Sequence, residues 1–135
     1  MTDEPTVQLP QGVKTLAEGK AFAALTTMLP DGQPQTHVMW FDVDHDTILI
    51  NTEVDRQKHK NMLRNSAVTV TVMDPTNPYR FFEVRGKFVG EVRGPEARAH
   101  IDACSQRYVG GPYQGTIGTE RVIMRIAPTR VYAQG

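Results

Sequence analysis

The chain lacks several features that would assign it to a common class of protein. Its 135 residues include one cysteine, Cys104, so an internal disulfide is excluded and a reducing compartment is expected. Basic and acidic residues number 15 each, and this balance argues against general binding to nucleic acid or membrane surfaces. No apolar run reaches the length of a membrane span, and residues 1–10 lack the basic and hydrophobic regions of a signal peptide. We therefore expect a cytoplasmic protein with neither a nucleic-acid nor a membrane partner.

Familiar catalytic motifs are also missing. The sequence contains no Gly-x-Gly-x-x-Gly after a strand, no P-loop and no Gly-x-Ser-x-Gly. The four histidines, His37, His45, His59 and His100, are scattered without zinc-ligand spacing, so no metal site is predicted. We expect His45, in a turn, and His59, on a polar helix, to be solvated. Cys104, on a predicted helix, is expected to be a small core residue rather than a nucleophile.

What the sequence does contain is a pattern of short apolar strands and turns, which predicts a mainly β protein with short α-helices. Helices are predicted at residues 10–19, 56–65 and 95–108. Strands are predicted at 21–29, 35–42, 47–52, 67–73 and 79–93, the last bent at Gly86 and Gly90, and at 121–133, interrupted by Pro128. A loop is predicted at 74–78. About six mostly antiparallel strands favour a closed or partly closed barrel, because closure removes exposed edges.

Residues 48–61 form the most informative segment, because an apolar strand there leads directly into a basic helix start. Arg56 and Lys60 are four residues apart, which would place them on one helix face, with Lys58 between them. Free backbone N–H groups and the positive end of the helix dipole would add to these cations and attract a phosphate. A solvated charged helix face explains the same residues, so the segment alone does not decide between the two interpretations.

Seven blocks of the sequence occur in an order and spacing typical of one family. They are 25–35 with Val38-Met39-Trp40, 51–64, 68–72, 74–80, 83–86, Arg107-Tyr108 and 121–131. Over residues 22–131 the chain resembles the pyridoxamine-phosphate-oxidase-like split-barrel superfamily, in particular its branch of deazaflavin-dependent oxidoreductases. The resemblance implies a split β-barrel of the FMN-binding type. We expect residues 1–135 to form a single split-barrel domain, with residues 1–18 as a short helical lead-in.

The same resemblance implies a homodimer with two cofactor sites at the subunit interface. The strand residues that would flank the cofactor ring are His37, Val38, Met39, Trp40, Asn51 and Thr52. The phosphate would be held by Arg56, Lys58 and Asn61, with Lys60 as an added cation near the groove, and Tyr79 and Arg80 would reach over from the partner subunit. Core packing for Trp40 and interface packing for Tyr79 and Arg80 are the alternatives.

The implied cofactor is coenzyme F420, with FMN as the alternative. The chain lacks the arginine- and serine-rich phosphate signature and the C-terminal extension of true pyridoxamine-phosphate oxidases, which argues against vitamin B6 chemistry. The implied function is an oxidoreductase that transfers hydride from reduced F420 to a small conjugated or unsaturated organic substrate. Two alternatives remain open: an FMN-binding oxidase or reductase, and a non-enzymatic flavin- or tetrapyrrole-binding protein.

No residue stands out as an obligatory acid or base. Tyr79, His37 or solvent could supply the balancing proton. We expect the substrate cavity to be framed by Trp40, Tyr79, Tyr113 and the glycine-containing loop at residues 110–112, whose flexibility would suit a lid.

Overall fold

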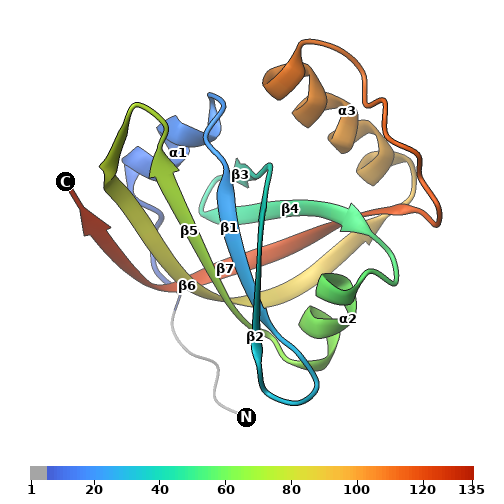
Figure 1. The fold of residues 1–135 in the computed structure, drawn as a ribbon, viewed down its shortest axis with the longest axis horizontal. Coiled ribbons are helices and arrows are strands. Elements are labelled where there is room, and N and C mark those ends of the chain that lie inside the picture. The colour runs from blue at the N-terminus through green and yellow to red at the C-terminus, as the bar shows by residue number, and fades with distance from the viewer. Residues whose placement is uncertain (1–5) are drawn as a thin grey trace.

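The computed structural model describes residues 6–135 and contains one seven-stranded sheet with three helices around it (Figure 1). The strands are β1 (Ala23–Met28), β2 (Pro34–Met39), β3 (Asp42–Asp44), β4 (Thr47–Glu53), β5 (Ala67–Asp74), β6 (Asn77–Arg93) and β7 (Arg121–Gln134). The helices are α1 (Gln11–Ala17), α2 (Gln57–Arg64) and α3 (Pro95–Val109). Each neighbouring pair of strands is antiparallel, in the order β2-β1-β5-β6-β7-β4-β3. The predicted mainly β class is confirmed. Of the predicted lead-in, residues 1–5 lie outside the described residues.

The two edges of the sheet are joined by only two residues. β2 and β3 are the outermost strands on opposite sides, yet only Trp40 and Phe41 separate them in sequence. Because two residues span less than about 10 Å, the sheet must curl until its edges meet there, and Figure 1 shows β2 running up to the short β3. The prediction of one strand over residues 35–42 is wrong at this point. Phe41 is buried, and its N–H donates to the hydroxyl of Tyr108 (3.3 Å).

The interior of the curled sheet is the hydrophobic core. The alternation in β5 behaves as predicted, because Val68, Val70 and Val72 are all buried on one face. Val84 of β6 and Met124 of β7 are fully buried in the same core. Burial of aliphatic side chains on one face is what makes this register unique, since a slip by one residue would expose all of them.

The turn between β5 and β6 is shorter than predicted. Only Pro75 and Thr76 connect the strands, and Asn77 and Pro78 belong to β6 rather than to a five-residue loop. The carboxylate of Asp74 accepts hydrogen bonds from the N–H and the hydroxyl of Thr76 (2.9 and 2.8 Å), an arrangement that tightens the turn.

Pro128 does not interrupt β7. It lies opposite Gly86 of β6, and the register shifts beside this pair, so that Thr129 is an extra residue in β7. A β-bulge is one of the places where a sheet accepts proline, and the missing side chain of Gly86 leaves room for the close approach of the strands.

In the view of Figure 1, α1 and α3 lie in the upper part of the molecule and α2 lies at the lower right. α3 packs against β4, β6 and β7, and α2 follows β4 and packs against β1 (Figure 1). Within residues 6–135, none of the helices is long and apolar enough to cross a membrane.

Candidate functional site

A cavity of about 270 Å³ lies where α3, α2, β4 and the β2–β3 junction meet the start of β7. Of the predicted site residues, those that line it are Val38, Met39, Trp40, Asn51, Thr52, Arg56 and Lys58. Residues that the sequence did not assign to the cofactor complete the wall: Phe22, Phe41, Leu49, Ile101, Cys104, Tyr113 and Arg121. The structure therefore brings the two predicted strand segments and the basic helix start together around one space.

Three cations gather at one end of this cavity: Arg56, Lys58 and Arg121. Burial lowers the pKa of Lys58, and the positive charges of Arg56 and Arg121 lower it further. Burial is also the main cause that lowers the pKa of Arg121. These shifts show that like charges are held close together, so an anion between them would relieve the repulsion.

One carboxylate sits behind the cations. Glu53 is buried, and one of its oxygens lies 2.7 Å from Arg56 and 3.7 Å from Arg121. Its other oxygen accepts the backbone N–H groups of Gly118 and Thr119 (2.8 and 3.1 Å). Burial would raise the pKa of Glu53, yet these N–H groups and the two arginines outweigh it and lower the pKa. One carboxylate among three cations leaves an excess of positive charge at the cavity.

Arg121 is the best-anchored of the cations. It is 6% exposed, and its Nε and Nη2 donate to the side-chain and backbone oxygens of Asn51 (2.8 and 3.2 Å). Its Nη1 and the hydroxyl of Thr52 are buried and have no hydrogen-bond partner among residues 6–135. Buried polar atoms without a hydrogen bond are uncommon in folded proteins, and both belong to residues that line the cavity. Nη1 keeps an ion-pair contact with Glu53 (3.7 Å), and an acceptor on a ligand would supply the hydrogen bond that it lacks.

An aromatic wall lies beside the cationic end, and the guanidinium of Arg121 is 5.1 Å from the ring centre of Tyr113. Trp40 stacks on Tyr108 with 5.1 Å between ring centroids and 7° between planes, and Tyr113 meets Trp40 edge-on at 6.4 Å. Tyr108 is fixed in turn, because its hydroxyl donates to the carbonyl of Ala21 and the guanidinium of Arg107 lies 4.8 Å from its ring centre. Trp40 therefore forms a rigid flat wall of the cavity, so the alternative of plain core packing is not what the structure shows.

A buried polar chain runs from the cation end of the cavity to α3. Asn51 Nδ2 lies 3.0 Å from the carbonyl of Ala97 and 3.0 Å from His100 Nδ1. The other ring nitrogen of His100 lies 3.0 Å from the carboxylate of Asp42. Burial would lower the pKa of His100, but its contacts with Asp42 and Cys104 outweigh burial and raise it to about 9. The chain ties Arg121, through Asn51, to a histidine on another element.

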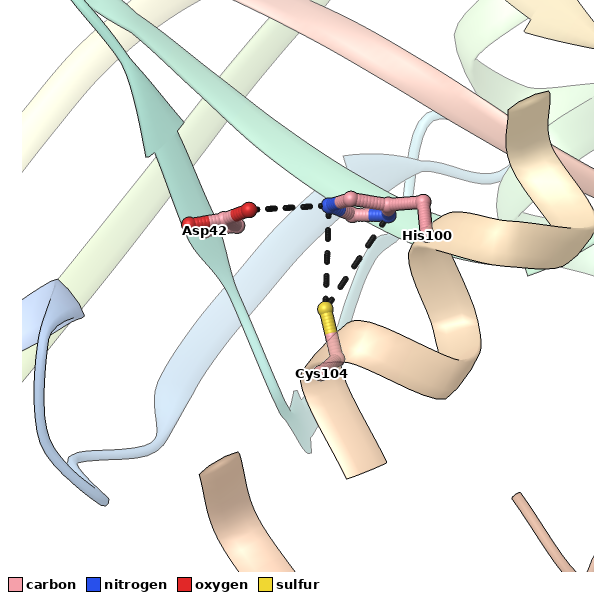
Figure 2. A group of neighbouring side chains, drawn as sticks. All are labelled: Asp42, His100 and Cys104. Atoms are coloured by element: carbon pink, nitrogen blue, oxygen red, sulfur yellow. Dashed lines mark hydrogen bonds and ion pairs between the residues drawn. The ribbon is translucent and has the colours of Figure 1, made fainter. Parts of the chain in front are cut away.

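Asp42, His100 and Cys104 form a compact group that could suggest a metal site (Figure 2). The sulfur of Cys104 lies 4.0 Å from one ring nitrogen of His100 and 3.7 Å from the other, so it sits beside the ring rather than ahead of Nε2. A metal bound by Nε2 must lie in the ring plane and ahead of that nitrogen, where the sulfur could not reach it at a bonding distance of about 2.3 Å. The group is arranged as a hydrogen-bonded cluster and not as a preformed metal centre.

Five of the predicted site residues do not line the cavity. His37 and Lys60 are exposed on β2 and α2, and Tyr79 and Arg80 lie on β6, with Tyr79 76% exposed. Asn61 is fully buried. Its amide donates to Thr27 (3.0 Å) and accepts from Gln57 (2.8 Å). It is therefore a structural residue in this chain, and contact of Tyr79 and Arg80 with a partner subunit's site stays a prediction.

Two further differences concern the basic segment itself. Arg56 precedes the first turn of α2 instead of lying within it, so the prediction that Arg56 and Lys60 share one helix face is wrong. It is Arg56 and Lys58 that line the cavity together. His59 is 1% exposed and not solvated, whereas His45 is exposed as predicted. Sequence reasoning also missed Arg121 as a site residue. It lies directly opposite Glu53 in the β4–β7 register, and only this distant pairing brings it to the cavity.

Comparison with known proteins is consistent with this geometry. Residues 9–135 match the family model described as pyridoxamine 5'-phosphate oxidase. No curated protein matches the chain.

Solved structures show the same fold. A structure described as an F420 reductase is 36% identical, with a TM-score of 0.80 over 92% of this chain and 98% of that one. A conserved hypothetical protein from Mycobacterium tuberculosis is 25% identical, with a TM-score of 0.75 over 98% of this chain and 89% of its own. A putative pyridoxamine 5'-phosphate oxidase from Listeria innocua, 20% identical, has a TM-score of 0.67 over 91% of this chain and 95% of its own.

Proposed function

The chain belongs to the pyridoxamine 5'-phosphate oxidase family and has its split-barrel fold, and we propose that it is an oxidoreductase that uses coenzyme F420. In this proposal the cavity holds the deazaflavin ring and its phosphate. The reaction is hydride transfer from reduced F420 to a small conjugated or unsaturated organic substrate. An FMN-dependent reaction in the same cavity is the second candidate.

One observation carries the proposal: the cavity has a cationic end with unpartnered polar atoms and an aromatic wall beside it. Arg56, Lys58 and Arg121 would share the negative charge of a phosphate, and Nη1 of Arg121, which has no hydrogen bond to the described residues, would gain an acceptor. No side chain of residues 6–135 caps the N-terminus of α2, which leaves its N–H groups available to the same anion. A phosphate attached to a flat ring fits both features.

The choice of F420 over FMN rests on similarity. The F420 reductase structure, at 36% identity, supports F420, whereas the charge pattern suits the phosphate of either molecule. Lys60, which was predicted as an added cation near the groove, and Arg64, one turn further along α2, give no support to F420. Lys60 is exposed outside the cavity, and Arg64 donates to the carbonyl of Met28 and to Asn61.

When bound, F420 would supply hydride-transfer chemistry, and the protein would supply position, charge and shape. Arg56, Lys58 and Arg121 would hold the phosphate, and the stacked ring of Trp40 would limit the tilt of the cofactor ring. His37 does not line the cavity of its own chain, and Tyr79 would reach a cavity only from a partner subunit. We therefore add Tyr113, which lines the cavity, to Tyr79 and solvent as a candidate proton source.

A volume of about 270 Å³ is just below the 300–1,000 Å³ range of most ligand sites, so part of the ligand would extend past the mouth. Apolar side chains are exposed there, with Phe22 at 53% and Val38 at 69%. We propose that a second copy of the chain covers this rim in a homodimer, as the family resemblance implies. Light scattering after size-exclusion chromatography should give about twice the 15.1 kDa chain mass, and a monomer would contradict the shared-site arrangement.

Competitive titration tests the choice of cofactor. Purified protein would be titrated with F420 and with FMN, and the bound fraction followed by fluorescence. Tighter binding of F420, followed by oxidation of reduced F420 in the presence of cyclic enones, is the expected result. Tighter binding of FMN would favour the second candidate, tight F420 binding without turnover would favour a carrier, and binding of neither would overturn the proposal.

A further inference from the structure

We propose that His59 is a positioning residue for the cationic end of the cavity: its buried ring holds the turn that aims Arg56 and Lys58. The inference rests on the proposed role of these two cations in holding a phosphate. It assigns a function to a histidine that does not line the cavity.

The turn before α2 has an uncommon backbone conformation. Asp55 has a φ of 73°, in the left-handed region, and the N–H of Arg56 donates to the carbonyl of Glu53 (3.2 Å). Val54 has no positive φ, so residues 53–56 form a turn of type II, in which glycine or asparagine is preferred at the position that Asp55 occupies. An aspartate there is strained relative to glycine and needs support from its surroundings.

His59 supplies that support. The backbone N–H of Asp55 donates to His59 Nδ1 (3.1 Å), and His59 Nε2 lies 3.1 Å from the carboxylate of Glu91 on β6. A backbone N–H can only donate, so Nδ1 is unprotonated and Nε2–H donates to Glu91. With 1% of its surface exposed, the ring has a single orientation, fixed from both sides.

The position of this hydrogen bond matters because it joins the turn to the helix. Asp55 directly precedes Arg56, and Lys58 directly precedes His59, so the bond closes a ring of backbone that contains both cavity cations. A side chain in the first turn of α2 thus reaches back to an N–H that precedes the N-cap residue Arg56, and no side chain of residues 6–135 caps the N–H groups of the helix itself. Without this hydrogen bond, the left-handed conformation of Asp55 would lose its side-chain support. The backbone that orients Arg56 and Lys58 toward the cavity would then be less well fixed.

Substitutions at both ends of the bond separate positioning from general stability. His59→Ala removes the acceptor and should weaken F420 binding about tenfold, the scale of one buried hydrogen bond. Asp55→Gly makes the left-handed conformation favourable without the histidine, so it should bind like wild type. In the His59→Ala background, Asp55→Gly should restore affinity to within about threefold of wild type. The remaining loss would then be smaller than the roughly tenfold loss of one buried hydrogen bond.

Three further measurements keep the test decisive. Asp55→Val keeps the His59 ring but disfavours the left-handed conformation of residue 55, so it should weaken F420 binding about tenfold. This variant tests the role of the turn if His59→Ala does not fold. Glu83→Gln is the matched control, expected to bind as wild type, because Glu83 lies on the same strand as Glu91 but bonds to Arg85 (2.8 Å) and not to His59. The ring ¹⁵N shifts of His59 should report the Nε2–H tautomer in wild type, whatever the cofactor is.

The outcomes are distinct from those that decide the proposed function. Wild type that binds neither F420 nor FMN contradicts the proposed function. Wild type that binds F420, together with a folded His59→Ala variant that binds equally well, overturns the role of His59. Failure of Asp55→Gly to restore binding in the double variant overturns it as well, because the effect of His59 would then not pass through the turn.

Discussion

Lys58 and Lys60 are two residues apart on α2, yet only Lys58 lines the cavity. Both carry the same charge on the same helix, so they form a matched pair for testing the phosphate site. Lys58→Ala should weaken F420 binding at least about tenfold, or 1.4 kcal/mol, through loss of a charge-assisted contact. Lys60→Ala should change the dissociation constant by less than about twofold, because exposed charges contribute little. Isothermal titration calorimetry of both variants measures this, and equal effects would contradict the assignment.

Arg121 should be more sensitive than its charge alone suggests. Its guanidinium donates to Asn51 through two nitrogens, while the third, Nη1, has no hydrogen bond within residues 6–135 and lies 3.7 Å from the carboxylate of Glu53. Lysine keeps the charge but cannot make this forked contact, so Arg121→Lys should weaken cofactor binding about tenfold. Arg125→Lys is the control, since Arg125 lies on the same strand and is half-exposed beside Asp44 (3.6 Å). Wild-type affinity in Arg121→Lys would reduce the role of Arg121 to simple charge.

Single residues also show where sequence reasoning ends. Lys58 and Trp40 were predicted as site residues because they lie in recognisable segments, and both line the cavity. Arg121 was not, because its partners Asn51 and Glu53 are about 70 residues away and are reached only through strand pairing. His59 was misjudged because a polar helix suggests exposure, whereas its burial depends on Glu91 of a distant strand.

At the scale of elements, the pairing of β6 with β7 depends on one glycine. A Cβ atom at Gly86 would lie 2.5 Å from the carbonyl oxygen of Ala127, closer than such atoms approach. Gly86→Ala should therefore lower the free energy of unfolding by about 1–3 kcal/mol, the range for overpacking. Gly111→Ala is a suitable control, because a Cβ atom there meets nothing within 4 Å. Urea denaturation of both variants measures the difference, and equal stability would show that the strands separate at little cost.

The same glycine explains which elements were predictable. β5 was predicted with nearly its observed bounds because its alternation is local to eight residues. The continuation of β7 through Pro128 was not, because it depends on Gly86, more than 40 residues earlier and on the facing strand. Similarly, the break between β2 and β3 follows from the hydroxyl of Tyr108 on α3 and not from any signal around Trp40.

For the whole molecule, three ionisable groups set a preferred pH range: Glu53, which is buried, and Asp42 and His100, which are partly buried. The pKa of His100 is raised to about 9, so its stabilising contribution is complete below pH 6.5 and is lost as the pH rises towards 9. Burial opposes ionisation of Asp42 and Glu53, yet their hydrogen bonds and cationic neighbours lower both pKa values. Their contribution is complete above about pH 4.5 and is lost as the pH falls further. Stability should be greatest between about pH 4.5 and 6.5.

The alkaline side of this profile can be assigned to one residue. Asn51 Nδ2 faces the other ring nitrogen of His100 and disfavours its protonation, so the loss between pH 6.5 and 9 should be smaller than the roughly 3 kcal/mol that a rise of the pKa from 6.5 to about 9 corresponds to. Thermal unfolding of wild type should show this decline, and His100→Gln should flatten it. An unchanged slope in His100→Gln would assign the decline to another group.

The joining of distant segments at the cavity has a consequence for the order of folding. β4 pairs with β7, so Ile48 can pair with Ile126 only after a long loop has closed. By contrast, β1–β2 and β5–β6 are hairpins that close locally. Loop closure over that separation is entropically slow, so the β4–β7 pairing should form after the hairpins, and it completes the cavity by bringing Arg121 to Asn51. A chain in which only the hairpins have formed would therefore lack both the β7 part of the core, including Met124 and Ile126, and the cationic end of the cavity. Ligand capture would thus report the final docking event rather than the collapse that precedes it.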